Sequence, residues 1–202
     1  MIKAIIFDFD GVIHNTLELA YKINKKLGAM ATLEEYKDFF NGNIYQHKQI
    51  FPEKVKKFFK LQNPKFKKLI IKQNIKEELY KLEQDYDLFI ISSNMEAALN
   101  SYLKNNKIEH IFKEVLGLES HKSKVYKFRW LMKKHGLGKN NSVFITDTLG
   151  DILEAKRVGI KTIAVDYGFH DRARLERGRP HKIVSDFREL AVEIKILMES
   201  ES

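Results

Sequence analysis

The stretch Lys3-Ala-Ile-Ile-Phe-Asp-Phe-Asp-Gly11 sets the fold of this 202-residue chain. A short apolar run that ends in acids and a glycine is typical of a buried strand in a parallel sheet. Similar runs follow at residues 87–92, 142–146 and 161–165, with weaker ones at 115–116 and 183–184. Because helical periodicity separates these runs, we expect right-handed crossovers and one parallel sheet.

One long segment interrupts this alternation. Residues 16–82 have a helical pattern without a convincing strand, and Phe51-Pro52 and Asn63-Pro64 are expected to divide them into short helices. The segment is too long for a single crossover. We therefore expect an α/β fold with a doubly wound, Rossmann-like core of residues 1–15 and 83–202, and a small inserted helical cap of residues 16–82. Trp130 and the phenylalanines are expected in the interior.

The composition excludes several classes of protein. The chain has no cysteine, which rules out zinc–thiolate sites, thiol catalysis and disulfide frameworks, and makes a reducing cytoplasm the expected compartment. No apolar run approaches the roughly 20 residues that cross a bilayer, and the N-terminus becomes acidic too soon for a signal peptide. We therefore expect a cytoplasmic protein without a membrane partner.

The chain is basic, with 36 Lys and Arg against 27 Asp and Glu and a net charge of +9. Nine of the lysines lie between Glu53 and Lys76, interleaved with apolar residues at helical spacings. We interpret this stretch as the solvated faces of two amphipathic helices, or as a rim that attracts phosphates.

Polar side chains follow the predicted strands at the edge where parallel sheets bind ligands. They are Asp8, Asp10, Ser92, Ser93, Asn94, Lys122, Lys124, Asp147 and Asp151. Asp8 and Asp10 project the same way from extended backbone, and the i, i+4 spacing of Asp147 and Asp151 puts both on one helix face. Because clustered carboxylates raise one another's pKa values, their proximity calls for a cation, and oxygen ligands favour Mg²⁺.

A site of this kind suits phosphoryl chemistry, because Mg²⁺ commonly binds phosphate oxygens. A carboxylate beside the ion can attack phosphorus and form an aspartyl-phosphate. A serine hydroxyl and a lysine ammonium can bind the transferring oxygens. Asp10 is placed to protonate the leaving alcohol and later to take a proton from water.

Four motifs in this order resemble those of the haloacid dehalogenase (HAD) superfamily of hydrolases. They are Asp8-Phe-Asp-Gly-Val-Ile-His-Asn-Thr16, Ile90-Ile-Ser-Ser-Asn94, a lysine at 122 or 124, and Phe144-Ile-Thr-Asp-Thr-Leu-Gly-Asp151. The tail from Ala164 is similar to phosphoglycolate-phosphatase-like members. The resemblance implies that Asp8 is the nucleophile and a metal ligand, and that Asp10 is the general acid/base and a ligand through its backbone carbonyl. It implies further metal ligands in Asp147, directly, and Asp151, directly or through water, and phosphate binding by Ser92. Separately from the resemblance, the amide of Asn94 could donate a hydrogen bond to phosphate or to metal-bound water.

The third motif departs from the Lys-Pro that the family often has, because Lys122-Ser-Lys124 offers two lysines. Ser123 could cap a helix and place Lys124 in its first turn, which favours Lys124 over Lys122 as the phosphate ligand. We therefore expect a Mg²⁺-dependent phosphatase that acts on a small phosphorylated metabolite. The alternatives are phosphoglucomutase-like phosphoryl transfer, and a less favoured nucleic-acid-end phosphatase or binding protein that uses the basic cap.

Overall fold

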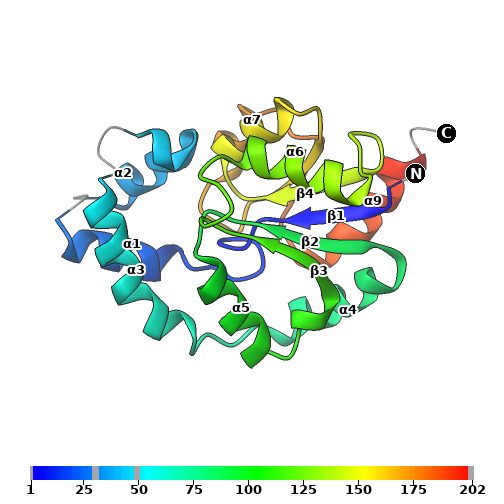
Figure 1. The fold of residues 1–202 in the computed structure, drawn as a ribbon. Coiled ribbons are helices and arrows are strands. Elements are labelled where there is room, and N and C mark those ends of the chain that lie inside the picture. Colours follow the sequence, from blue (N-terminus) through cyan, green and yellow to red (C-terminus); the bar gives the residue numbers. More distant parts are fainter. Residues whose placement is uncertain (1, 29–31, 48–50, 200–202) are drawn as a thin grey trace.

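A parallel sheet forms the centre of the computed structural model, which describes residues 2–28, 32–47 and 51–199 (Figure 1). Its strands, in spatial order, are β3 (Phe112–Leu116), β2 (Asp87–Ile91), β1 (Ala4–Phe7), β4 (Ser142–Thr146), β5 (Lys161–Val165) and β6 (Lys182–Val184). β1 pairs in parallel with both β2 and β4, so that Phe7 lies opposite Ile90 and Ile145. The expected α/β fold is confirmed, and Asp8 leaves the sheet near its middle.

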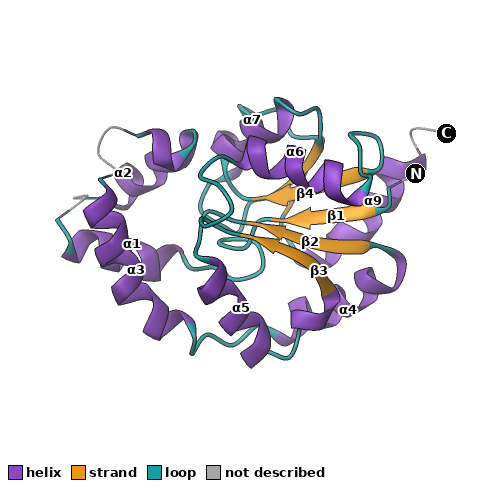
Figure 2. Cartoon of the chain, viewed as in Figure 1, coloured by secondary structure: helices purple, strands orange, loops and turns teal. Residues whose placement is uncertain are grey.

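Helices cover both faces of the sheet (Figure 2). One layer contains α4 (Gln73–Asp85), α5 (Glu96–Asn105) and α9 (Leu190–Glu199), and the other contains α6 (Lys124–His135) and α7 (Leu149–Lys156). The short α8 (Arg172–Glu176) connects β5 to β6. Successive side chains of β1 point to opposite faces of the sheet, so β1 packs against both helical layers. Ile5 and Phe7 join the first apolar cluster, and Ala4 and Ile6 join the second.

A separate group of helices stands beyond the carboxyl ends of the strands (Figure 1). This cap contains α1 (Leu17–Lys26), α2 (Leu33–Asp38) and α3 (Pro52–Phe66), with two 3-10 turns, η1 (Phe39–Asn41) and η2 (Ile44–Gln46). Its small apolar cluster includes Ala20 and Tyr36, and Phe169 from the loop after β5 packs into the same cluster. An aromatic side chain of the main body therefore anchors the cap.

Two helices differ from the expectation. Pro52 begins α3 as expected, but Pro64 lies inside α3 and does not divide it. Pro64 stands in the last turn, where its missing N–H removes a single backbone hydrogen bond. The second difference is α4, which was expected in an insert of residues 16–82. Its Ile75, Leu79 and Leu82 belong to the main apolar cluster, so α4 covers the sheet.

Trp130 lies at the surface, where it contacts a lysine. Trp130 was expected in the interior but is 39% exposed on α6, with the Lys134 ammonium 4.7 Å from its ring centroid. This cation–π contact takes the place of burial.

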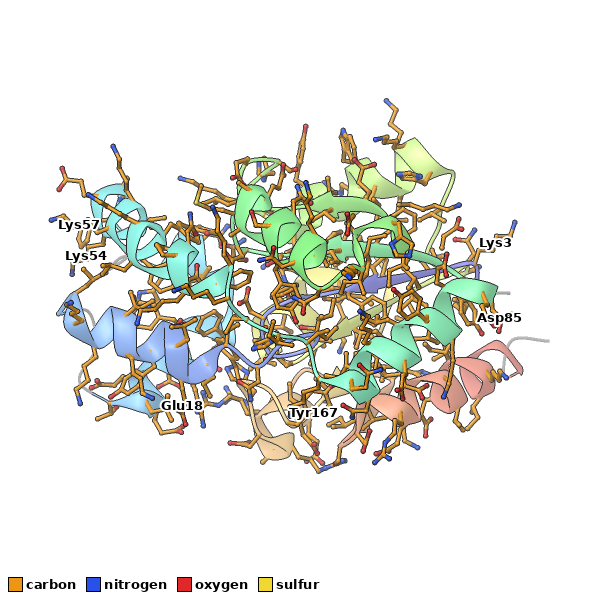
Figure 3. All side chains as sticks on the ribbon, turned by 90° about the horizontal axis from the view of Figure 1, so that it is seen from below. Lys3, Glu18, Lys54, Lys57, Asp85 and Tyr167 are labelled. Carbon is orange, nitrogen blue, oxygen red and sulfur yellow. The ribbon has the colours of Figure 1, made fainter. Side chains whose placement is uncertain are left out.

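Lys54 and Lys57 lie near the end of α3 that points away from the sheet (Figure 3). Among the described residues, no helix combines the length and apolar character that a bilayer crossing requires.

Candidate active site

Asp8 directly follows β1 and lies at the floor of the candidate site. Its carboxylate accepts a hydrogen bond from the Phe9 N–H at 2.7 Å, and Lys124 Nζ lies 2.8 Å from its Oδ2. Burial raises the pKa of Asp8 well above its ordinary value; Lys124 opposes this shift, while Asp151 and Asp147 add to it. A nucleophilic, ionised Asp8 therefore needs more positive charge than Lys124 alone supplies.

Lys124 is the lysine that reaches these carboxylates. It is the first residue of α6, and its buried ammonium lies 2.6 Å from Asp151 Oδ2 as well as beside Asp8. Burial by itself would lower the pKa of Lys124, but the two carboxylates hold it above its ordinary value. Lys122 is exposed. Of the two expected lysines, the structure brings Lys124 into the site.

Asp10 is held by three neutral donors. Thr16 Oγ1 donates to it at 2.6 Å, Asn94 Nδ2 at 3.1 Å and Ser92 Oγ at 3.4 Å. Burial raises the pKa of Asp10, and the hydrogen bonds from Thr16 and Asn94 oppose part of that shift. A carboxyl group with a raised pKa is suited to proton transfer. Ser92 and Asn94 therefore lie at the site, where they hydrogen-bond Asp10.

Asp147 is the most deeply buried of the four acids. It follows β4 and is wedged between Gly11 and Gly168, since a Cβ on either glycine would overlap its carboxylate. The Phe169 N–H donates to Oδ2 at 2.7 Å, whereas the buried Oδ1 has no hydrogen-bond partner. Burial raises the pKa of Asp147 to about 8. The unpartnered oxygen and the raised pKa of Asp147 both indicate that a cation next to this carboxylate would stabilise it.

Asp151 lies in the first turn of α7, with Thr148 as the N-cap. Its carboxylate accepts hydrogen bonds from Lys124 Nζ and, at 3.0 Å, from Thr146 Oγ1. Burial acts to raise the pKa of Asp151, but Lys124 and these hydrogen bonds lower it below its ordinary value. Asp151 is therefore the carboxylate that most readily keeps its charge.

The acids fit a hard cation in their chemistry, although they do not form a ready-made cage. In the described part of the chain, no three acidic or histidine side chains gather closely enough to hold an ion. However, the donors are all oxygens, Asp147 Oδ1 is unpartnered, and Lys124 is the cation that contacts both Asp8 and Asp151. Mg²⁺ binds such oxygens and would offset the remaining negative charge.

A cavity of about 120 Å³ separates these acids from the cap. Its core side carries Asp8, Asp10, Asn94, Lys124 and Asp151, and its cap side is largely aromatic, with Tyr36, Phe40, Tyr45, Phe58, Phe59 and Gln62. The volume is below the roughly 300 Å³ at which sites for drug-sized ligands begin. The space between the acids and the cap therefore suits a small ligand.

Several polar contacts hold the cap against the core, among them the ion pairs of Arg174 with Glu34 and Asp38. The Tyr45 hydroxyl donates to the Ser93 carbonyl at 2.6 Å, and Asn43 Nδ2 donates to Glu154 Oε1 at 3.0 Å. Gly150 in α7 lies against the backbone of Gly42 in the cap. Side-chain and main-chain contacts thus join the cap to the core beside the cavity.

Lys127 is a buried residue beside the site that was not predicted from the sequence. Its side chain is buried, and its ammonium donates to the carbonyls of Ser92 at 2.5 Å and Gly117 at 3.0 Å, just beyond β2 and β3. Burial lowers the pKa of Lys127 to about 7, and nearby Lys124 adds to the shift. The sequence shows that Lys127 lies one helical turn after Lys124, but this spacing does not show that the side chain is buried.

Glu154 was not predicted either. Its carboxylate accepts the hydrogen bond at the start of α6 that was expected to go to Ser123. Ser123 is the N-cap of α6 but makes no side-chain cap bond. Instead, Glu154 Oε1 accepts from the Lys124 N–H and from the Ser123 hydroxyl, both at 3.1 Å. Its spacing of three residues from Asp151 was a signal that both side chains share a face of α7.

Known proteins provide an independent comparison. A phosphoglycolate phosphatase from Aliivibrio fischeri is 25% identical over 58% of this chain and 53% of its own length. One from Mannheimia succiniciproducens is 30% identical over 58% and 54%. The chain thus spans about half the length of these two relatives. A Caldanaerobacter subterraneus protein with the provisional name of a pyrophosphatase is 26% identical over 96% of this chain and 95% of its own.

The fold has close counterparts among solved structures. A haloacid dehalogenase-like family hydrolase from Streptococcus pneumoniae superposes with a TM-score of 0.79 at 22% identity, over 96% of this chain and 98% of that one. The family model described as haloacid dehalogenase-like hydrolase matches residues 5–165, which include the acids at the ends of β1 and β4. The chain therefore belongs to the haloacid dehalogenase-like hydrolase family.

Proposed function

We propose that the protein is a Mg²⁺-dependent phosphatase that hydrolyses a small phosphomonoester through an aspartyl-phosphate on Asp8. The main support is the buried Lys124 ammonium between Asp8 and Asp151, in the same cavity as Asp10. An ammonium in this place can neutralise the oxygens of a phosphoryl group bound at the cavity floor. The relatives named phosphoglycolate phosphatase support the same reaction class.

In the first step, a carboxylate oxygen of Asp8 attacks phosphorus, and the bond from phosphorus to the leaving oxygen breaks. Asp10 gives its proton to that oxygen, and the alcohol departs. Asp10 then accepts a proton from a water that attacks phosphorus, so the bond to Asp8 breaks and phosphate is released. Lys124 and Ser92 bind the phosphoryl oxygens during both steps.

Asp8, Asp147, Asp151 and the backbone carbonyl of Asp10 are the groups that would hold Mg²⁺. When bound, the ion supplies the charge that lets an anionic nucleophile approach an anionic phosphate. The unpartnered oxygen of Asp147 and the raised pKa values of Asp8 and Asp147 support this assignment.

Release of phosphate from phenyl phosphate in the presence and absence of Mg²⁺ tests the proposal. We expect Asp8→Asn and removal of Mg²⁺ with EDTA each to abolish release. The control Asp87→Asn, a half-buried acid paired with Lys113 at the start of β2 and remote from the cavity lining, should retain it. Lys124→Met should lower kcat/KM by at least about 100-fold, whereas exposed Lys122→Met should leave it nearly unchanged. Full activity in Asp8→Asn would refute the mechanism.

The same material separates the two alternatives. Transfer of the phosphoryl group from glucose 1-phosphate to a second sugar hydroxyl, without release of phosphate, would identify a mutase. Salt-sensitive binding of an oligonucleotide that persists in Asp8→Asn would indicate a nucleic-acid-binding protein that uses the exposed lysines of α3. We favour the phosphatase because its candidate groups line one cavity between the core and the cap. We also propose that it acts in the cytoplasm, on the basis of its lack of cysteine.

A further inference from the structure

Gln62 is a buried polar residue on the apolar side of α3. It is 2% exposed and lines the cavity together with Phe58 and Phe59, which lie one turn earlier on the same helix face. Its amide oxygen is buried and has no hydrogen-bond partner. Among the described residues that line the cavity, it is the one whose side chain has an unpartnered buried polar atom.

The other amides and hydroxyls of the cap wall are already engaged. Asn24 donates to the Ala20 carbonyl at 2.9 Å and interacts with the Tyr36 hydroxyl. Asn43 and Tyr45 bind the core across the cap boundary. These side chains therefore have structural partners, whereas Gln62 has none for its acceptor.

An unpaired acceptor in an apolar setting lowers stability, and an apolar side chain of similar shape would avoid that cost. Native proteins keep buried unpaired polar groups mainly where water, an ion or a ligand provides the missing hydrogen bond. Gln62 is one of the residues that line the cavity, as are Asp8 and Lys124; to meet a ligand there, its amide would have to turn its covered oxygen toward that space. A ligand whose phosphate lies against Asp8 and Lys124 would extend its leaving group toward the cap.

We propose that Gln62 is a specificity-determining residue that accepts a hydrogen bond from a hydroxyl of the substrate's leaving group. This inference rests on the proposed phosphatase function and narrows its substrate to a small hydroxylated phosphomonoester. The aromatic rings beside Gln62 would pack against the carbon skeleton, while its oxygen selects a donor over a carboxylate. A carboxylate would instead be drawn to Lys54, which also lines the cavity and lies nearer the other end of α3 (Figure 3).

The test compares glycerol 1-phosphate, phosphoglycolate and phenyl phosphate as substrates of the wild type and of Gln62→Met. Methionine keeps the length of the side chain and removes the acceptor. We expect kcat/KM for glycerol 1-phosphate to fall about tenfold or more, while kcat/KM for phenyl phosphate changes little. The melting temperature should stay the same or rise, because an unsatisfied buried group is removed. Gln84→Met, at an exposed position on α4, is the matched control.

Several results would overturn the assignment. An equal loss for all three substrates, or a loss confined to phosphoglycolate, would show that Gln62 does not select a hydroxyl. A lowered melting temperature, or failure of Gln62→Met to fold, would show that the amide stabilises the cap. If the wild type hydrolyses none of the three esters, the proposed phosphatase function itself fails. Wild-type activity on phenyl phosphate with unaltered selectivity in Gln62→Met refutes the role of Gln62 alone.

Discussion

Gly150→Ala should separate cap closure from catalysis. A Cβ at Gly150 would overlap the Gly42 carbonyl oxygen and lie 2.7 Å from the Gly42 carbonyl carbon and 2.8 Å from the Phe40 oxygen. All three are main-chain atoms of the cap and cannot rotate away. Since ordinary van der Waals contacts begin near 3.4 Å, the Gly42 oxygen, which is the nearest of the three atoms, requires the cap to retreat by about 1 Å. Displacements near 1 Å can reduce rates about 100-fold when groups on both sides of a site must meet the substrate.

The expected result is a 10- to 100-fold loss of kcat/KM for phenyl phosphate, an order-of-magnitude range, without loss of folding. Stability should be preserved because alanine in a helix is favoured over glycine by up to about 1 kcal/mol, which offsets part of the steric cost. Gly138→Ala is the control, because a Cβ there meets no atom within 4 Å. Unchanged kcat/KM in Gly150→Ala, with Gly138→Ala also unchanged, would refute the view that the closed cap is the active arrangement.

Two further predictions concern buried charge. Lys127→Met leaves the carbonyls of Ser92 and Gly117 without their donor, so the free energy of unfolding in urea should fall by roughly 1–3 kcal/mol; an equal or greater stability would contradict this role. The second prediction concerns Asp147. In the folded protein its pKa is about 8, whereas an unfolded aspartate ionises near pH 3.9, an approximate reference value. Between these values the folded state binds the extra proton, so the melting temperature of metal-free protein in EDTA should fall as the pH rises from about 4 to about 8. Saturating Mg²⁺ should flatten this slope, and a flat profile in EDTA would count against the buried, protonated Asp147.

The strands were predictable because a strand buried on both faces leaves an apolar run in the sequence. The runs at 142–146 and 161–165 coincide with β4 and β5. The extent of the cap was harder to predict, because an amphipathic helix has the same periodicity against any apolar surface. The apolar face of α4 gave no sign that it packs against the sheet. The predicted helix break at Pro64 was wrong because the effect of a proline depends on how near the end of the helix it lies, and the sequence does not show where α3 ends.

The acids of the candidate site could be predicted because they follow strands, and the ends of parallel strands meet at one edge. The choice between Lys122 and Lys124 depended on where α6 begins, and the helix start at Lys124 turns that side chain inward. Lys127 was not predictable as buried, because lysines at the start of a basic helix usually face solvent. Gln62 was not predictable either, since only the folded cap shows that its amide oxygen is buried without a hydrogen-bond partner.

The two glycines that flank Asp147 have a consequence for motion in this molecule. Gly11 follows β1 and Gly168 follows β5. Two backbone segments more than 150 residues apart in the sequence therefore pack against the same carboxylate. A side chain confined by backbone has little freedom to swing during a reaction cycle. We therefore expect Asp147 to keep its position through the reaction, and any motion that accompanies substrate entry or product release to occur in the cap helices instead.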